Sequence, residues 1–253
     1  MMPHISSPGN RGCRCAVFCK GNDDMNLFDT DFHCHILPGI DDGAANIDES
    51  IKLINMQMEQ GIRNIVATPH FRLHEMNVKT FLQRRSEAYK KLLACNAIQH
   101  KPKIMLAAEV ALERNVCYAD GIELLANQEM NTLLLEIPYE GYRKWMSEEI
   151  EEIAYRTRKQ IIIAHLDRYV DIFSEADYND ILNIPDAIFQ FNTSVFTRWK
   201  SKRLLKPLIK DDYPIVFGTD CHNSTSRKPN FDLMLKNLKK YEPNYYVRRL
   251  FEK

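Results

Sequence analysis

DFHCHILPGIDDG, residues 31–43, combines the end of an apolar strand, a Pro-Gly turn and two adjacent carboxylates. Alternate residues of a strand share a face, so the sequence predicts that His33 and His35 point the same way with Asp31 beside them. Two imidazoles on one face can bind a divalent ion, and the loop can bring Asp41 or Asp42 towards a second ion. Taken alone, this segment is weak evidence for a metal, because two unrelated histidines on a strand would give the same pattern.

The composition predicts an ordinary soluble globular protein. The 253 residues are 45% hydrophobic and 27% charged, with a formal net charge of zero. This balance gives no reason to expect a nucleic-acid or anionic-membrane partner, and no apolar run approaches the ~18 residues of a membrane span. Seven scattered cysteines argue against a disulfide framework. We therefore expect a cytoplasmic protein without membrane insertion, and we leave a homo-oligomer open.

The chain divides into two unequal parts. Residues 1–24 are rich in Gly, Asn, Ser and Arg and lack the apolar core of a signal peptide, so we expect a disordered leader. Met25 is a plausible natural start, in which case the leader is not translated. Residues 25–253 show no internal boundary and are expected to form one domain.

Strand and helix patterns alternate along that domain. After the first strand, expected strands cover Ile62–Thr68, Lys103–Val110, Thr132–Ile137, Gln160–Ala164, Ala187–Asn192 and Ile215–Thr219. Expected helices run from a cap at Asn46 or Asp48 to Gln60, and over Val78–Ala97, Gly121–Asn127 (weakly), Met146–Lys159 and Phe231–Phe251. About seven short, continuously apolar strands separated by helices favour a parallel sheet, and a single α/β barrel is the simplest solution.

Polar residues occupy one recurrent position in this pattern, the C-terminal end of a strand. They are His33, His35, His70, Glu109, Glu136, His165, Asp220 and His222. Each has an ordinary explanation on its own: His70 could cap a turn, Glu109 could pair with a lysine, and His165 could be a satisfied core histidine. Together they predict an active site at the barrel rim, because polar strand ends without partners would destabilise the fold.

The donor types indicate the chemistry. Mixed imidazole and carboxylate ligation suits Mn, Fe or Zn, and Cys34 and Cys221 alternate with the candidate ligands and are expected to pack in the core. Clustered metals indicate hydrolysis, with phosphate esters as the leading substrates. Arg168 is the best-placed phosphate clamp and Arg227 the second, although either could be a solvated surface arginine.

From Phe28 to Arg227 the chain resembles the PHP (polymerase and histidinol phosphatase) superfamily, most closely the bacterial manganese-dependent protein tyrosine phosphatases of capsule and exopolysaccharide operons. The motifs that carry the resemblance are Asp31–Gly43, Ala67-Thr68-Pro69-His70, Glu109, Glu136, His165-x-x-Arg168 and Gly218-Thr219-Asp220-x-His222. The resemblance implies a distorted (β/α)7 barrel with a metal site at the C-terminal ends of its strands.

The resemblance also implies a site with three metals, most commonly Mn. The implied ligand sets are His33, His35, Glu109 and Asp220; Asp42, His70 and His222; and Glu136 and His165, with Glu109 bridging the first and third ions. A metal-bridged hydroxide would attack phosphorus while Arg168 steadies the phosphoryl oxygens, with Asp42 and Glu109 as the other candidate catalytic residues and Arg227 as a second substrate-binding residue. The implied substrate is the phosphotyrosine-bearing tail of an autokinase that regulates polysaccharide synthesis and that could recruit the enzyme to the inner membrane face.

The chain departs from the family in two places. His165-Leu166-Asp167-Arg168 replaces the usual His-Pro-Glu-Arg, and an unusually long segment precedes the first histidine. Two other functions stay open: a histidinol-phosphate or other small-molecule phosphoesterase on the same scaffold, and an inactive metal-binding module that docks onto a kinase or glycan-assembly complex.

Overall fold

The computed structural model describes residues 29–95 and 102–238, and its strands all run parallel within two sheets. The three-stranded sheet has the order β1 (Thr30–Cys34), β2 (Asn64–Ala67), β4 (Lys103–Leu106). The six-stranded sheet has the order β3 (His70–Phe71), β5 (Glu109–Ala111), β6 (Thr132–Glu136), β7 (Gln160–Ile163), β8 (Ile188–Asn192), β9 (Ile215–Gly218).

The two sheets form one closed wall. The chain passes directly from β2 into β3 and from β4 into β5, and the backbone bonds from Ala107 N to Ala67 O (2.9 Å) and from Glu109 N to Pro69 O (3.1 Å) continue across both breaks. On the other side, Cys34 of β1 pairs with Cys221 just after β9, and Asp220 N donates to His33 O at 2.7 Å. β3 continues the line of β2, and β5 continues the line of β4, so each of these pairs counts as one strand position of the barrel. Counted in this way, the described chain forms a wall of seven strand positions. The expected distorted seven-position barrel is confirmed.

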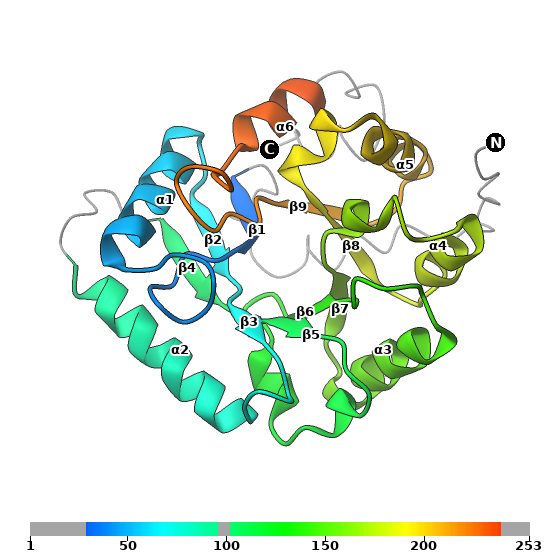
Figure 1. Ribbon diagram of the computed structural model, residues 1–253, viewed down its shortest axis with the longest axis horizontal. Helices are drawn as coiled ribbons and strands as arrows, with labels where there is room; N and C mark the ends of the chain where they lie inside the picture. The colour runs from blue at the N-terminus through cyan, green and yellow to red at the C-terminus, as the bar shows by residue number, and fades with distance from the viewer. Residues whose placement is uncertain (1–28, 96–101, 239–253) are drawn as a thin grey trace.

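The helices lie around the outside of this wall (Figure 1). Asn46 caps α1 (Ile47–Glu59) by accepting a hydrogen bond from Glu49 N, and Asn77 caps α2 (Val78–Leu93) in the same way. Together with α3 (Lys144–Thr157), these confirm the expected helices within a few residues at each end. The segment expected to be weakly helical contains a 3-10 helix over Ile122–Leu125.

Two helices were not predicted. α4 (Glu175–Leu182) begins with a capping box, in which Ser174 and Asp177 bond each other's backbone N–H groups. α5 (Trp199–Lys210) buries Leu204, Leu205, Leu208 and Ile209 on one face despite an internal proline at Pro207. The Ser-x-x-Asp signal and the leucine spacing could have identified both.

The start of the last expected helix is confirmed by α6 (Phe231–Leu238). Its continuation to Phe251 and the expected leader over residues 1–24 lie outside the described residues. Among the described residues, no helix is both long enough and apolar enough to cross a bilayer.

Two apolar layers support the rim. The larger core lies between the barrel wall and the helices. Two smaller clusters lie on the inner side of the wall, one formed by Phe32, Leu134, Ile162, Ala164, Ile188 and Val216 and the other by Val66, Met105 and Ala107. Because side chains alternate along a strand, the next inward-facing positions after Leu134 and Ile188 are Glu136 and Gln190. The apolar layer thus closes the barrel from below and leaves its C-terminal end to polar residues.

Candidate metal centre

All nine predicted ligands converge at the C-terminal end of the barrel. Groups whose donor atoms lie within 4.8 Å of one another are His35, Asp42, His70 and His222; His33, His35 and Asp220; and His70, Glu109 and Glu136, with His165 bonded to Glu109 at 2.9 Å. The predicted positions of two ligands need correction. His70 and Glu109 begin the short strands β3 and β5 rather than ending longer ones, because the wall breaks at Thr68-Pro69 and at Ala107-Ala108.

Glu109 is the hub of the cluster. Its Oε2 atom lies 3.1 Å from His33 Nε2, 3.3 Å from His35 Nε2 and 3.0 Å from His70 Nδ1, while Oε1 lies 2.9 Å from His165 Nε2. The carboxylate is almost completely buried. One buried carboxylate therefore connects imidazoles from four different positions of the chain.

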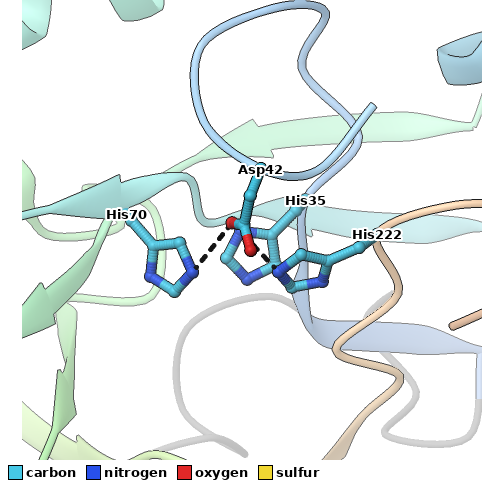
Figure 2. Close-up of side chains that lie close together, drawn as sticks. All are labelled: His35, Asp42, His70 and His222. Atoms are coloured by element: carbon cyan, nitrogen blue, oxygen red, sulfur yellow. Dashed lines mark ion pairs between the residues drawn. The ribbon is translucent and has the colours of Figure 1, made fainter. Parts of the chain in front are cut away.

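Asp42 completes a second group on the solvent side of the cluster. It reaches in from the loop after β1 and lies between His70 and His222, with Oδ1 3.3 Å and 3.4 Å from their Nε2 atoms (Figure 2). The ring of His35 lies next to both, with its centroid 4.0 Å from that of His222. Asp42 is the most accessible of these side chains, at 66% exposure.

Two ligand positions adopt a backbone conformation that favours glycine. His165 has φ +31° and Asp220 has φ +50°, each two residues after the end of its strand, β7 or β9. Non-glycine residues held at positive φ cost free energy, and such strain is concentrated at functional sites. The turn redirects each side chain into the centre as its strand ends.

The electrostatics of the centre favour bound positive charge. Burial raises the pKa of Glu109, but the surrounding histidines outweigh it and hold this pKa well below its usual range. Burial also opposes the charged form of His165, yet its bonds to Glu109 and Glu136 raise its pKa to about 10. Conversely, burial and the charge of His35 lower the pKa of His222 to about 4. The cluster therefore attracts cations, but its imidazoles cannot all be protonated at the same time.

The donor atoms fit divalent metals. Asp41 Oδ2 lies 2.8 Å from His35 Nδ1, and hydrogen bonds keep the pKa of Asp41 at about 2, so Nδ1 carries a proton. Burial opposes the charged form of His35, but its bonds to Asp41 and Glu109 hold its pKa well above the usual value, so a metal at Nε2 would displace a proton. His222 Nε2 is buried without a hydrogen-bond partner, and Glu109 Oε2 is buried among imidazole nitrogens. Buried imidazole nitrogens and carboxylate oxygens that face one another are the arrangement that Mn, Fe or Zn would complete.

The Asp31 carboxylate bonds the backbone N–H of His33 at 3.1 Å but not the imidazole rings, which corrects the expectation from strand alternation. The register of β1 shifts between Asp31 and Cys34, and Asp31 instead accepts bonds from the N–H and hydroxyl of Thr219 at 2.9 Å and 2.5 Å. Burial raises its pKa to about 6. Cys34 and Cys221 are buried in the core as expected. These three residues join β1 to the end of β9 outside the imidazole cluster.

The two predicted arginines lie at the rim and contact candidate ligands. Arg168 Nη1 donates to Glu136 Oε1 at 2.8 Å, and its guanidinium lies over the ring of Tyr139. Arg227 Nη2 donates to Asp220 Oδ1 at 2.9 Å. Their side chains are 46% and 44% exposed, so both could turn towards an anion arriving from solvent.

Sequence reasoning missed three polar residues that contact the candidate ligands. Asp41, considered beside Asp42 but not chosen, bonds His35 and the backbone N–H of His70. Gln190 and Asn192 were treated only as part of an apolar strand. Their alternation at the end of that strand, Gln-x-Asn, is the signal that could have identified them.

Two glycines allow the strand ends to approach each other. A Cβ atom on Gly43 would lie 2.4 Å from His35 Cβ, and one on Gly218 would lie 2.5 Å from His33 Cβ. We expect Gly218→Ala to lower the free energy of unfolding of the metal-free protein by about 1–3 kcal/mol, because the clash involves strand backbone. Urea unfolding measures this, with Gly141→Ala as control because a Cβ there meets nothing within 4 Å. Equal effects of the two substitutions would contradict the close approach.

Comparison with known proteins places this chain in a family. The profile described as "Capsular polysaccharide synthesis, CpsB/CapC" matches residues 29–253. The chain belongs to this CpsB/CapC family, which confirms the resemblance drawn from its motifs.

Individual relatives agree. The chain is 24% identical over 227 residues to the putative tyrosine-protein phosphatase CapC of Staphylococcus aureus, covering 82% of this chain and 81% of that protein. A 40-residue segment, 16% of each protein, is 55% identical to tyrosine-protein phosphatase YwqE of Bacillus subtilis. The fold matches a chain from a crystallographic study of YwqE from Bacillus subtilis and CpsB from Streptococcus pneumoniae, described as metal-dependent tyrosine phosphatases, with TM-score 0.68, 20% identity, and coverage of 87% of this chain and 90% of that one.

Proposed function

We propose that this protein is a metal-dependent phosphotyrosine-protein phosphatase. The observation that carries the proposal is the convergence of four histidines on Glu109 beneath two rim arginines. Membership of a capsular polysaccharide synthesis family and the tyrosine phosphatase names of relatives support the same activity. The proposed substrate is the phosphotyrosine-bearing tail of a tyrosine autokinase that regulates capsular or exopolysaccharide synthesis.

The resemblance divides these ligands among three metals. His33, His35, Asp220 and Glu109 would hold the first; Asp42, His70 and His222 the second; and His165, Glu136 and Glu109 the third. Contacts of 2.9 to 3.7 Å within these sets support the division, and a contact of 3.0 Å between His70 Nδ1 and Glu109 Oε2 joins the first two sets. When bound, divalent metals supply positive charge for the phosphoryl oxygens and lower the pKa of water towards neutrality.

The chain's own contribution is positioning and charge. Arg168 would leave Glu136 to donate paired hydrogen bonds to the phosphoryl oxygens, and Arg227 would do the same from the side of Asp220. No cysteine nucleophile is required. Burial raises the pKa of the Cys34 thiol well above its usual value, and its Sγ points to Val66 O rather than into the cluster.

The direct test is phosphate release from a phosphotyrosine peptide, measured with the full-length protein and added Mn. We expect turnover that is abolished by a chelator and restored by Mn, and that exceeds turnover of histidinol phosphate. His35→Ala should lose this activity, while His74→Ala should retain it, because His74 is exposed and bonds Glu113 outside the centre.

Each alternative gives a distinct result. Faster hydrolysis of histidinol phosphate than of the peptide would replace the proposed substrate with a small molecule. Mn binding without hydrolysis of either substrate would overturn the phosphatase and leave an inactive docking module.

A further inference from the structure

β8 is the barrel position that delivers none of the nine candidate ligands, yet it ends in polar residues that face the centre. Gln190 is fully buried, and the side chain of Asn192 lies two residues further along the same face. A buried amide beneath a charged cluster must have defined hydrogen-bond partners. The partners of these two residues include three of the candidate ligands: His33, His165 and Asp220.

One backbone N–H determines the orientation of the Gln190 amide. His165 N lies 2.6 Å from the Gln190 atom facing it, and a backbone N–H can only donate, so that atom is the oxygen Oε1. Gln190 Nε2 therefore donates to Asn192 Oδ1 at 3.0 Å. Asn192 Nδ2 in turn donates to Asp220 Oδ2 at 3.1 Å. These three hydrogen bonds form a line from His165 through Gln190 and Asn192 to Asp220, and the donor and acceptor of each bond are assigned.

The same oxygen determines the tautomer of His33. Gln190 Oε1 lies 3.1 Å from His33 Nδ1, and an amide oxygen can only accept, so the proton resides on Nδ1. In the neutral ring that a metal ligand requires, His33 Nε2 then carries the lone pair, 3.1 Å from Glu109 Oε2 and 3.1 Å from His35 Nε2. The nitrogen that faces the centre is the one free to bind a metal.

The far end of the line is held by the loop after β7. Asp167 is buried, and its Oδ1 accepts a hydrogen bond from Asn192 N at 2.9 Å. At the other end, the absence of a Cβ on Gly218 leaves room for the Gln190 amide, since such an atom would lie 3.1 Å from Nε2. The line is therefore fixed on both sides by groups outside the metal centre.

We propose that Gln190 and Asn192 are positioning residues of the metal centre. Gln190 holds His33 in the Nδ1–H tautomer, and Asn192 binds Oδ2 of Asp220 so that Oδ1 faces the imidazoles. This inference rests on the metal centre of the proposed function and goes beyond it by assigning residues that bind no metal themselves. Outer partners of metal ligands typically contribute about 10- to 100-fold to metal affinity.

The test is Mn affinity of the full-length protein, measured by the loss of the free-ion electron paramagnetic resonance signal. Gln190→Met, which keeps the side-chain volume and removes the acceptor, should weaken binding about 10- to 100-fold. Gln190→Glu keeps an oxygen facing both His33 and His165 but loses the donor to Asn192 Oδ1, so its Mn affinity should lie between that of Gln190→Met and that of the wild type. Gln57→Met is the matched control, because Gln57 is equally buried and bonds Cys221 without touching a ligand.

Rescue by glutamate is the outcome that a merely structural role would not produce. Equal weakening by Gln190→Met and Gln190→Glu, or none by either, would overturn the proposal, as would equal weakening by Gln57→Met. Wild-type protein that binds no Mn would overturn the metal centre itself, and the proposed function with it.

A second measurement needs no variant and so does not depend on its folding. In the zinc-loaded wild-type protein, which is diamagnetic, long-range ¹H–¹⁵N correlation spectra report which ring nitrogen carries the proton. We expect His33 to be protonated at Nδ1 with Nε2 bound. A proton on Nε2 would overturn the assignment even if the enzyme proved active.

Discussion

Glu109→Gln is expected to weaken Mn binding at least about 100-fold and to abolish chelator-sensitive phosphate release. The substitution keeps the shape of the side chain but removes the charge to which four imidazoles are directed. Removing one partner from a buried charge cluster costs about 3–5 kcal/mol, and every 1.4 kcal/mol is a tenfold change in affinity. Mn titration and phosphate release measure the two effects separately.

Glu113→Gln is the matched control for this experiment. Glu113 also pairs with a histidine, His74, and accepts a bond from a backbone N–H, that of Leu73, but it lies outside the cluster. Its replacement should leave both readouts unchanged. Near-normal Mn affinity in a folded Glu109→Gln protein, judged by circular dichroism, would contradict the role of Glu109 as the hub.

Arg168→Met is expected to lower kcat/KM for a phosphotyrosine peptide about 10²- to 10³-fold, the usual cost of removing one donor that stabilises developing negative charge. Its effect on Mn affinity should stay within about fivefold, since an exposed ion pair with Glu136 contributes about 1 kcal/mol or less. Arg168→Lys should recover only part of the activity, because an ammonium group cannot form two parallel bonds to phosphate.

Arg156→Met provides the control. Arg156 is as exposed as Arg168, pairs with a glutamate and also lies over a tyrosine ring, that of Tyr118, but on α3 away from the centre. It should retain full activity. If Arg168→Met loses Mn affinity as strongly as activity, the arginine supports the ligands rather than the phosphate, and the clamp assignment falls.

Much of the fold could be predicted because its signals are local. Continuous apolar runs identified the barrel strands, and Asn46 identified the start of α1 through a bond to an N–H three residues away. The short helix α4 and the proline-containing α5 were overlooked. Their stability comes mainly from packing, as the buried leucines of α5 show, and a weak local pattern does not reveal packing.

The identities of the candidate ligands were also readable from the sequence. A histidine or carboxylate that ends an apolar strand is unfavourable without a polar partner, and a shared partner at the barrel rim satisfies all eight such residues together. The sequence did not show which of these ligands contact the same partner. The contacts of Glu109 join residues 39 to 76 positions apart in the chain, and only the closed barrel determines those distances.

The sequence by itself therefore determined the class of fold, the donor types and the rim on which they lie, because strand alternation and apolar runs are properties of neighbouring residues. Only the tertiary structure decided that β2 and β4 break before His70 and Glu109, that Asp31 turns to Thr219, and that Asp41 holds the ring of His35. It alone placed Gln190 against His33, 157 residues away. The physical reason is that hydrogen bonds between distant strands depend on the register and closure of the barrel, which no local pattern encodes.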